Sequence, residues 1–285
     1  MNNLRKHRSL LIGCVGTTPN IGTTTAAFAL AVRLAEQLDA SVGHLCLNLK
    51  SAKLHRYLGC DRPAVTLDGL RPELRAGTLD AAKLRRACEP AGRLPNLRVL
   101  FGNLMRDQAE YYTPEEMAEL LAVARETFAV TVVDVSAYWD NAATVMAMRE
   151  ADMRLLATTT ALSGFQEDAR RWIGQISPLF GVEQGSYRLV VMHPPWRENS
   201  GFGRRDVARE TGLELAGELQ LTQGLLAQLD SGGLAEWVRE DKHGRRAMAR
   251  VAADTMRRCG LQPKPAVAVR PWYRRLQPQE RGGMG

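Results

Sequence analysis

The chain of 285 residues is 45% hydrophobic and 24% charged, with a formal net charge of +7. This length accommodates one large α/β domain, alone or with an appendage, and no apolar run approaches the roughly 18–20 residues that cross a bilayer, which excludes a membrane-spanning protein. The basic excess leaves two interpretations open: an acidic partner such as nucleic acid or anionic lipid, or an arginine-rich surface in solvent.

Short apolar runs alternate with segments of helical periodicity along the chain. The runs predict strands at residues 10–15, 42–49, 97–101, 130–135, 153–158, 189–192 and 215–219. The periodic segments predict helices at residues 23–38, 80–88, 113–128, 142–151, 164–180, 205–211, 222–229, 234–240 and 243–259. Strands that are apolar throughout and separated by helices are buried on both faces, so the pattern predicts an α/β/α sandwich with a mainly parallel sheet.

The expected domain covers residues 1–260, and residues 261–285 are expected to form an extended basic tail, which either docks on a partner or is an ordinary disordered tail. Within the domain, Thr113 followed by Pro114 and two glutamates predicts a capped helix start. The five cysteines are odd in number and scattered, without a Cys-x-x-Cys pair. They indicate a reducing cytoplasm with neither disulfides nor a metal site.

The loop after the first predicted strand, Gly16–Thr25, is rich in glycine and threonine and runs directly into a helix. Such a turn can hold a phosphate at the amino end of the helix, and a P-loop adds a lysine for the phosphates and a hydroxyl for Mg²⁺. Gly22, Thr23, Thr24 and Thr25 keep the glycine and the hydroxyls, but no lysine is present. From this segment alone, a phosphate loop and a helix capped by threonines are equally good interpretations.

The order of these elements resembles the MinD/ParA family of P-loop NTPases, whose deviant Walker A motif reads Lys-Gly-Gly-x-Gly-Lys-Thr-Thr. In this resemblance Thr18 and Thr23 occupy the two lysine positions, and Val130–Asp134 is similar to the Walker B strand. The resemblance implies a P-loop NTPase fold and assigns nucleotide binding to the following residues: Thr18, Asn20, Gly22, Thr23, Thr24 and Thr25. It implies that Thr24 and Asp134 hold Mg²⁺.

Within that family the chain most resembles the CpaE/TadZ-type localisation proteins of pilus assembly, over roughly residues 9–260. The resemblance implies a positioning or assembly factor for a pilus, secretion or conjugation apparatus, cytoplasmic or peripheral at the inner face of the membrane. It also implies protein partners of that assembly, and either a homodimer or a heterodimer with a catalytic relative. Tyr138 and Trp139 follow the Walker B strand, where relatives face the dimer partner; ordinary packing is the alternative for both residues.

Several departures from the family pattern indicate a degenerate site. Asn48 and Lys50 stand where relatives carry two acids, and Met192 or His193 stands where relatives carry an adenine-binding asparagine. A hydrogen bond to a charged group contributes roughly 1.5–3 kcal/mol, so loss of two lysines weakens triphosphate binding by about one to four decades. We therefore expect a pseudo-ATPase with no catalytic residue, which binds ATP or ADP with Mg²⁺ weakly or binds no cofactor.

Two other functions stay open on the sequence. One is an active ATPase of the same family with an unusual loop, which hydrolysis measurements would reveal. The other is a DNA-binding partition protein, which the net charge permits but which the motifs favour less; its affinity for duplex DNA would fall steeply with salt.

Overall fold

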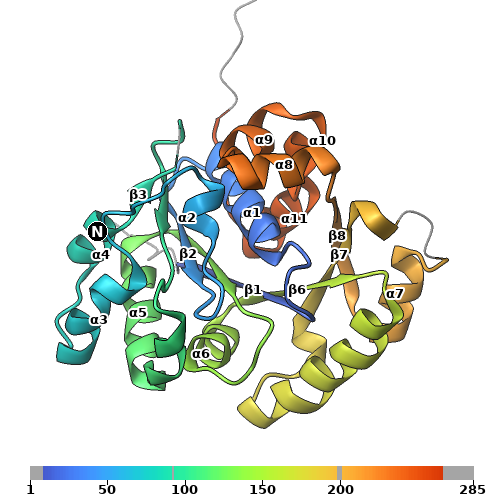
Figure 1. Ribbon diagram of the computed structural model, residues 1–285, viewed down its shortest axis with the longest axis horizontal. Coiled ribbons are helices and arrows are strands. Elements are labelled where there is room, and N and C mark those ends of the chain that lie inside the picture. The colour runs from blue at the N-terminus through green and yellow to red at the C-terminus, as the bar shows by residue number, and fades with distance from the viewer. Residues whose placement is uncertain (1–8, 92, 198–200, 266–285) are drawn as a thin grey trace, which may run out of the picture.

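The computed structural model describes residues 9–91, 93–197 and 201–265, which form one eight-stranded sheet in the order β3-β4-β2-β5-β1-β6-β7-β8 (Figure 1). Neighbouring strands are parallel, except for the short antiparallel pair of β3 with β4. The strands are β1 (Leu10–Gly16), β2 (Val42–Leu47), β3 (Glu89–Pro90), β4 (Leu97–Leu100), β5 (Val130–Val135), β6 (Met153–Thr159), β7 (Tyr187–His193) and β8 (Glu214–Gln220). The mainly parallel sheet is confirmed.

Helices cover both faces of the sheet and produce two separate apolar cores. One face carries α1 (Thr23–Gln37), α8 (Gln223–Ser231), α9 (Leu234–Glu240), α10 (Lys242–Arg246) and α11 (Ala249–Cys259), next to the short α2 (Leu54–Tyr57). The other carries α3 (Leu67–Ala76), α4 (Ala81–Ala87), α5 (Pro114–Thr127), α6 (Ala142–Glu150) and α7 (Arg204–Thr211), with 3-10 turns between elements. Among the described residues, no helix is long and apolar enough to cross a bilayer.

Most predicted elements are present within two residues of their expected ends; two helical segments differ, and α2, α3 and β3 were not predicted. Helix α3 lies in a stretch expected to be irregular: Pro72 falls inside the helix, yet Leu67, Leu70 and Leu74 are buried. Residues 163–176 are wound as π-helix, where an α-helix was expected. The helix expected over residues 243–259 is broken at Met248, whose positive φ of 57° redirects the chain.

The predicted cap of α5 is a reciprocal one. The Oγ1 of Thr113 accepts a hydrogen bond from the backbone N–H of Glu116 at 3.2 Å, and Glu116 Oε2 accepts from the N–H of Thr113 at 2.9 Å. The Glu116 carboxylate also lies 3.2 Å from Arg75 and 3.8 Å from Arg71. The cap therefore ties the start of α5 to α3, a helix that the sequence did not predict.

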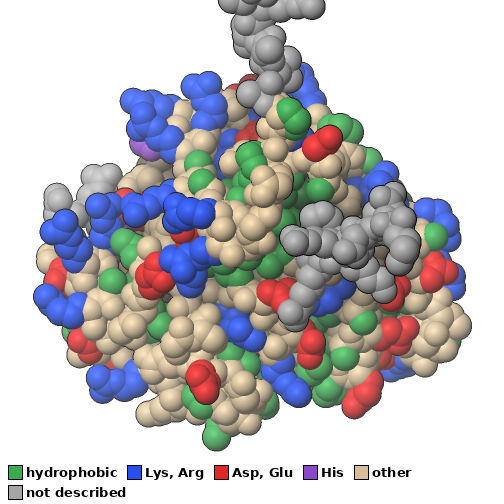
Figure 2. Space-filling view, turned by 180° about the vertical axis from the view of Figure 1, so that it is seen from behind, with side chains coloured by type: hydrophobic (Ala, Val, Ile, Leu, Met, Phe, Trp, Pro, Cys, Tyr) green, Lys and Arg blue, Asp and Glu red, His purple; other side chains and the backbone are tan. Residues whose placement is uncertain are grey.

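Charge is unevenly distributed over the surface. Figure 2 shows Lys and Arg side chains gathered at the upper left of the back view, at the end of the molecule formed by α9, α10 and α11. Several Lys and Arg side chains of these helices are exposed or half-buried, among them Arg239, Lys242, Arg245, Arg246 and Arg250. The expected basic tail lies beyond this surface in sequence, and its residues 266–285 lie outside the described part of the chain.

His44 in β2 is a buried group with a testable effect on stability. Its side chain is fully buried, packs edge-on against Phe28, and neither ring nitrogen has a hydrogen-bond partner among the described residues. Burial lowers the pKa of His44 to about 3. Because the folded pKa is below the unfolded one, this group's contribution to stability is complete above pH 6.5 and is lost as the pH falls towards 3.

We expect His44→Met to raise the free energy of unfolding by about 1–3 kcal/mol at pH 7, because no unsatisfied ring nitrogen is then buried. The gain should be larger at pH 5, where the wild-type imidazole must stay neutral against its solution pKa. Urea unfolding at both values measures it, with the exposed His243→Met as control. An equal change in unfolding free energy from pH 7 to pH 5 in the wild type and His44→Met would exclude His44 as the titrating group.

Candidate functional site

The loop between β1 and α1 leaves the amino end of α1 open. Asn20 and Gly22 have positive φ values of 61° and 93°, and Gly22 is the N-cap residue of α1. No side chain caps the helix there, so the threonines do not act as the cap that was one interpretation of the sequence. The free N–H groups of the first turn and the positive end of the helix dipole therefore remain available to an anion.

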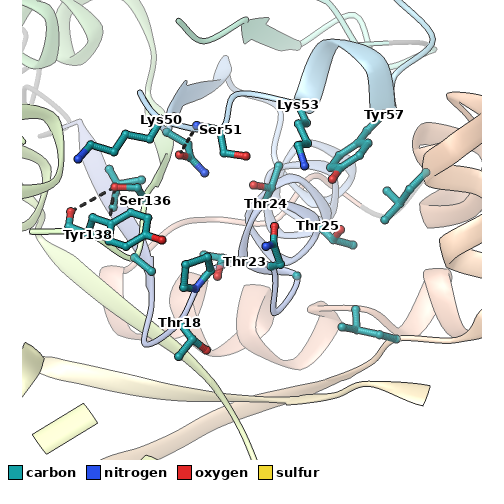
Figure 3. Close-up of a pocket in the computed structure, with 18 of the residues that line it drawn as sticks. Thr18, Thr23, Thr24, Thr25, Lys50, Ser51, Lys53, Tyr57, Ser136 and Tyr138 are labelled. Carbon is teal, nitrogen blue, oxygen red and sulfur yellow. Dashed lines mark hydrogen bonds between the residues drawn. The ribbon is translucent and has the colours of Figure 1, made fainter. Parts of the chain in front are cut away.

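This loop forms one wall of a cavity of about 350 Å³ at the carboxyl edge of the sheet (Figure 3). Every residue that the sequence assigned to nucleotide binding lines it: Thr18, Asn20, Gly22, Thr23, Thr24 and Thr25. Asn48 and Lys50 also line it, although they are separated from the loop by more than twenty residues. The structure therefore brings the predicted phosphate and water positions into one site.

Thr24 connects the cavity with the buried acid of β5. Its Oγ1 donates a hydrogen bond of 2.7 Å to Oδ2 of Asp134, whose side chain is fully buried. The other carboxylate oxygen, Oδ1, has no hydrogen-bond partner among the described residues. Burial raises the pKa of Asp134 to about 7, against the lowering effect of the Thr24 hydrogen bond. The two residues expected to hold Mg²⁺ are thus in direct contact.

Two thiols flank Asp134 on the neighbouring strands. Cys14 of β1 and Cys46 of β2 are each paired in register with Asp134, and the Cys46 sulfur lies 3.9 Å from its Oδ2. Burial, reinforced by the Asp134 charge, raises the pKa of both thiols. Among the described residues, no cation near the acid favours its charged form.

Thr23 does not replace the lysine whose position it occupies. Its Oγ1 lies over the loop backbone, where a Cβ on Gly16 would come within 2.6 Å of it. The side chain lines the cavity, but it is short and neutral. The loop therefore contributes amides and hydroxyls to the cavity, but no cation.

Asn48 and Lys50 are both held by partners outside the loop. The Asn48 Oδ1 accepts the backbone N–H of Ser51 at 3.1 Å, which closes a local turn. Lys50 lies 2.5 Å from Oδ2 of Asp140 and 3.7 Å from Glu110, and it also covers the ring of Tyr138. Figure 3 shows the Lys50 side chain directed away from the threonines. Lys50 is thus engaged elsewhere and does not supply the missing positive charge.

Sequence reasoning missed two other cations, Lys53 and Arg106, which line the same cavity. Lys53 is the N-cap residue of α2 and is exposed, and no ion pair or hydrogen bond of its ammonium is present among the described residues. In Figure 3 its ammonium points down to the side of the cavity where Thr24 lies. The signal was available: a lysine soon after a central strand must lie at the carboxyl edge, where this loop also lies.

An apolar part of the cavity lining comes from the residue after β8 and from α8. This part consists of Leu221, Leu225, Leu226 and Leu229. Helix α8 is held against α2 by a backbone contact, because a Cβ on Gly232 would come within 2.5 Å of the Gly59 Cα. The cavity therefore combines a polar, cationic side with an apolar side.

Of the remaining predicted positions, one lines the cavity and the others do not. Tyr138 lines the cavity and is 40% exposed, as an interface residue requires. Trp139 is only 4% exposed and stacks on Phe180 at 6.0 Å, so of the two interpretations its burial favours ordinary packing. Met192 is buried against Gly22 and His193 contacts Glu218, so neither residue lines the cavity.

No protein-family model matches the chain, and no curated protein matches it. Solved structures do. A ParA family ATPase from Chlorobium tepidum TLS is similar with a TM-score of 0.74 and 16% identity, over 86% of this chain and 99% of that one. The septum site-determining protein MinD from Pyrococcus horikoshii OT3, complexed with Mg-ADP, is similar with a TM-score of 0.72 and 18% identity, over 90% of this chain and 100% of that one.

A third similar structure is a putative plasmid partition protein from Borrelia burgdorferi B31 bound to AMPPNP, with a TM-score of 0.63 and 11% identity, over 87% of this chain and 99% of that one. Each of the three chains is covered almost completely. At these identities the likeness establishes the architecture, and the chain therefore has the fold of the MinD and ParA ATPases.

Proposed function

We propose that this protein is a MinD/ParA-family positioning or assembly factor whose nucleotide site binds phosphate weakly and has lost most of its hydrolytic parts. One observation carries the proposal: the loop keeps an open helix end beside a cavity, while both lysine positions are threonines and Lys50 is held by Asp140. Phosphoryl transfer depends almost wholly on positioning and charge neutralisation, so turnover suffers more than binding. Asn48, an amide, cannot accept a proton from an attacking water.

The donor set at the base of the cavity fits Mg²⁺. This ion commonly uses one or two carboxylates, with water and substrate phosphates completing its shell. Asp134 offers the unpartnered Oδ1 and Thr24 offers its hydroxyl oxygen. Mg²⁺ held there would neutralise phosphate charge, and it would also favour the ionised form of Asp134, which burial alone disfavours.

Lys53 is our candidate for a cation that contacts a bound phosphate, because it lines the cavity, has no acidic partner among the described residues, and directs its ammonium to the side of Thr24 in Figure 3. We expect Lys53→Met to weaken ATP binding by about tenfold, the effect of losing one hydrogen bond to a charged group. Isothermal titration with Mg-ATP measures the change. Lys242→Met is the matched control, because Lys242 is an exposed lysine of α10 outside the cavity.

The proposed function is tested by titrating ATP and ADP with and without Mg²⁺, together with steady-state hydrolysis. We expect weak, Mg²⁺-dependent binding with little or no turnover. Hydrolysis at the rate of an ordinary ParA-type ATPase would overturn the proposal and favour the active-ATPase alternative. Equal titration curves for Lys53→Met and the wild type would remove Lys53 from the site, but would leave the rest of the proposal standing.

Exposed apolar side chains around the cavity also support a proposal about partners. Apolar side chains are exposed around the cavity on the loops that follow strands β4, β5 and β7, namely Leu104, Met105, Tyr138 and Trp196. This surface supports a face-to-face homodimer, or a heterodimer with a catalytic relative, within a pilus, secretion or conjugation assembly at the inner face of the membrane. Sedimentation with and without nucleotide distinguishes a constitutive dimer from a nucleotide-dependent one.

A further inference from the structure

The outer edge of β8 carries a second cavity, which shares no lining residue with the cavity of the phosphate loop. It has a volume of about 480 Å³ and runs along the strand, where Leu215, Gly217, Glu218, Leu219 and Gln220 line it. β8 is the last strand of the sheet and pairs only with β7 among the described residues. In a parallel pair, half of the backbone N–H and C=O groups of an edge strand point away from the sheet, and they form a template for another strand.

The cavity's other walls are cationic and lie on both faces of the sheet. Arg204 belongs to α7, which packs in the core that contains Val207, while Arg246 and Arg250 belong to α10 and α11 on the opposite face. Arg204 is paired with Glu218. Arg246 and Arg250 are exposed, and no carboxylate of the described residues pairs with them.

We propose that the outer edge of β8 binds an extended acidic peptide as an additional strand of the sheet. The peptide backbone would pair with the free backbone groups of β8, and its side chains would alternate between the two faces. Acidic residues of the peptide on the face of α10 and α11 would accept hydrogen bonds from the guanidinium groups of Arg246 and Arg250. Acidic residues on the other face would compete with Glu218 for Arg204.

Charge selects this occupant over two others that the chain itself could supply. A second copy of the chain, pairing edge to edge through β8, would bring the same arginines together. The chain's own residues 266–285 contain Arg270, Arg274, Arg275 and Arg281 against the single acid Glu280, so this tail has the wrong sign. Duplex DNA has the right sign, but it offers no groups that continue a β-sheet.

The probe is a fluorescein-labelled octapeptide of alternating valine and glutamate. Its binding to the full chain is measured by fluorescence anisotropy. We expect saturable binding that the double substitution Arg246→Glu with Arg250→Glu weakens by about tenfold, since two rim ion pairs become repulsive. Lys242→Glu with Arg245→Glu, an equal charge change on α10 outside the cavity, should alter the affinity less than twofold. A peptide with lysine in place of glutamate should not bind.

Replacing two central valines of the peptide by proline removes backbone donors and should abolish binding. Amide hydrogen exchange of β8 in the wild-type protein gives a second readout, because an added strand should slow exchange within residues 214–220 and leave β4 unchanged. Equal binding of the proline peptide, or an affinity insensitive to Arg246 and Arg250, would overturn the proposal. Tighter, arginine-dependent binding of duplex DNA that displaces the peptide would show a nucleic-acid surface instead.

Discussion

Replacement of Asp134 by asparagine is expected to stabilise the protein at pH 8, by about 1–3 kcal/mol in the free energy of unfolding. Burial raises the pKa of this carboxyl from 3.8 to about 7. At pH 8 the folded chain therefore contains an ionised carboxylate in an apolar environment, at a cost of about 4 kcal/mol for the three-unit shift. Asparagine removes that charge but leaves an amide to satisfy, which costs about 1–3 kcal/mol.

The sign of the pH dependence follows from the same shift. Between pH 3.8 and 7 the folded state binds a proton that the unfolded state has released, so the unfolding free energy of the wild type falls as the pH rises through this range. Asp134→Asn lacks this slope, and its advantage should disappear near pH 4. Urea unfolding at pH 4, 6 and 8 measures both effects.

Asp140→Asn is the matched control, because its pKa is shifted in the opposite direction. Partial burial alone would raise the pKa of Asp140, but hydrogen bonds from Lys50 and Asn141 hold it below its ordinary value. Its replacement should destabilise the protein slightly at pH 8 and release Lys50. If Asp134→Asn were less stable than the wild type at pH 8, then Asp134 would be compensated by a partner that the described residues do not show.

Thr23→Lys is expected to increase the affinity for Mg-ATP by about tenfold to a hundredfold. A lysine at the first residue of α1 would place a cation beside the open helix end, and one hydrogen bond to a charged phosphate accounts for a change of this size. Turnover should remain low, because Asn48 still stands at the water position. Adding Asn48→Asp to this variant should raise hydrolysis more than either change alone.

Thr23→Met separates charge from bulk, because methionine has similar length and no cation. It should bind Mg-ATP no more tightly than the wild type. Equal affinities of the lysine and methionine variants would show that the phosphates do not reach residue 23. Rapid hydrolysis by the unmodified protein would contradict the loss of catalytic parts directly, and would make Lys53 or Arg106 the compensating cation to examine next.

The fold and the loop could be predicted because their signals are local. An apolar strand, a turn with Gly22 and a periodic helix are adjacent in sequence. Each can be recognised from a short stretch of sequence, through its backbone geometry or its periodicity. Helix α3 was missed because Pro72 breaks the local pattern while burial of its leucines, a tertiary effect, holds the helix together. The π-helical segment shows no sequence feature that distinguishes it from an ordinary amphipathic helix.

The site was predicted only where its residues belong to one segment or to a strand end. Lys50 was a candidate cation, but its carboxylate partner Asp140 lies 90 residues further along the chain. For Trp139 both an interface and ordinary packing were open, and the ring on which it stacks, Phe180, follows 41 residues later. Partners at such separations depend on how the elements pack, so periodicity and spacing could not reveal them.

Alkylation of the two thiols beside Asp134 can measure how often the centre of the sheet opens. Cys14 and Cys46 are buried with raised pKa values, so an alkylating reagent can modify them only when the sheet opens, whereas the exposed Cys259 reacts from the folded state. The labelling half-time of Cys14 and Cys46 therefore reports how often the region around the candidate site opens in native buffer. Where opening and closing are fast relative to labelling, a ligand that binds only the folded state lengthens this half-time by the factor 1 + L/Kd, where L is the free ligand concentration.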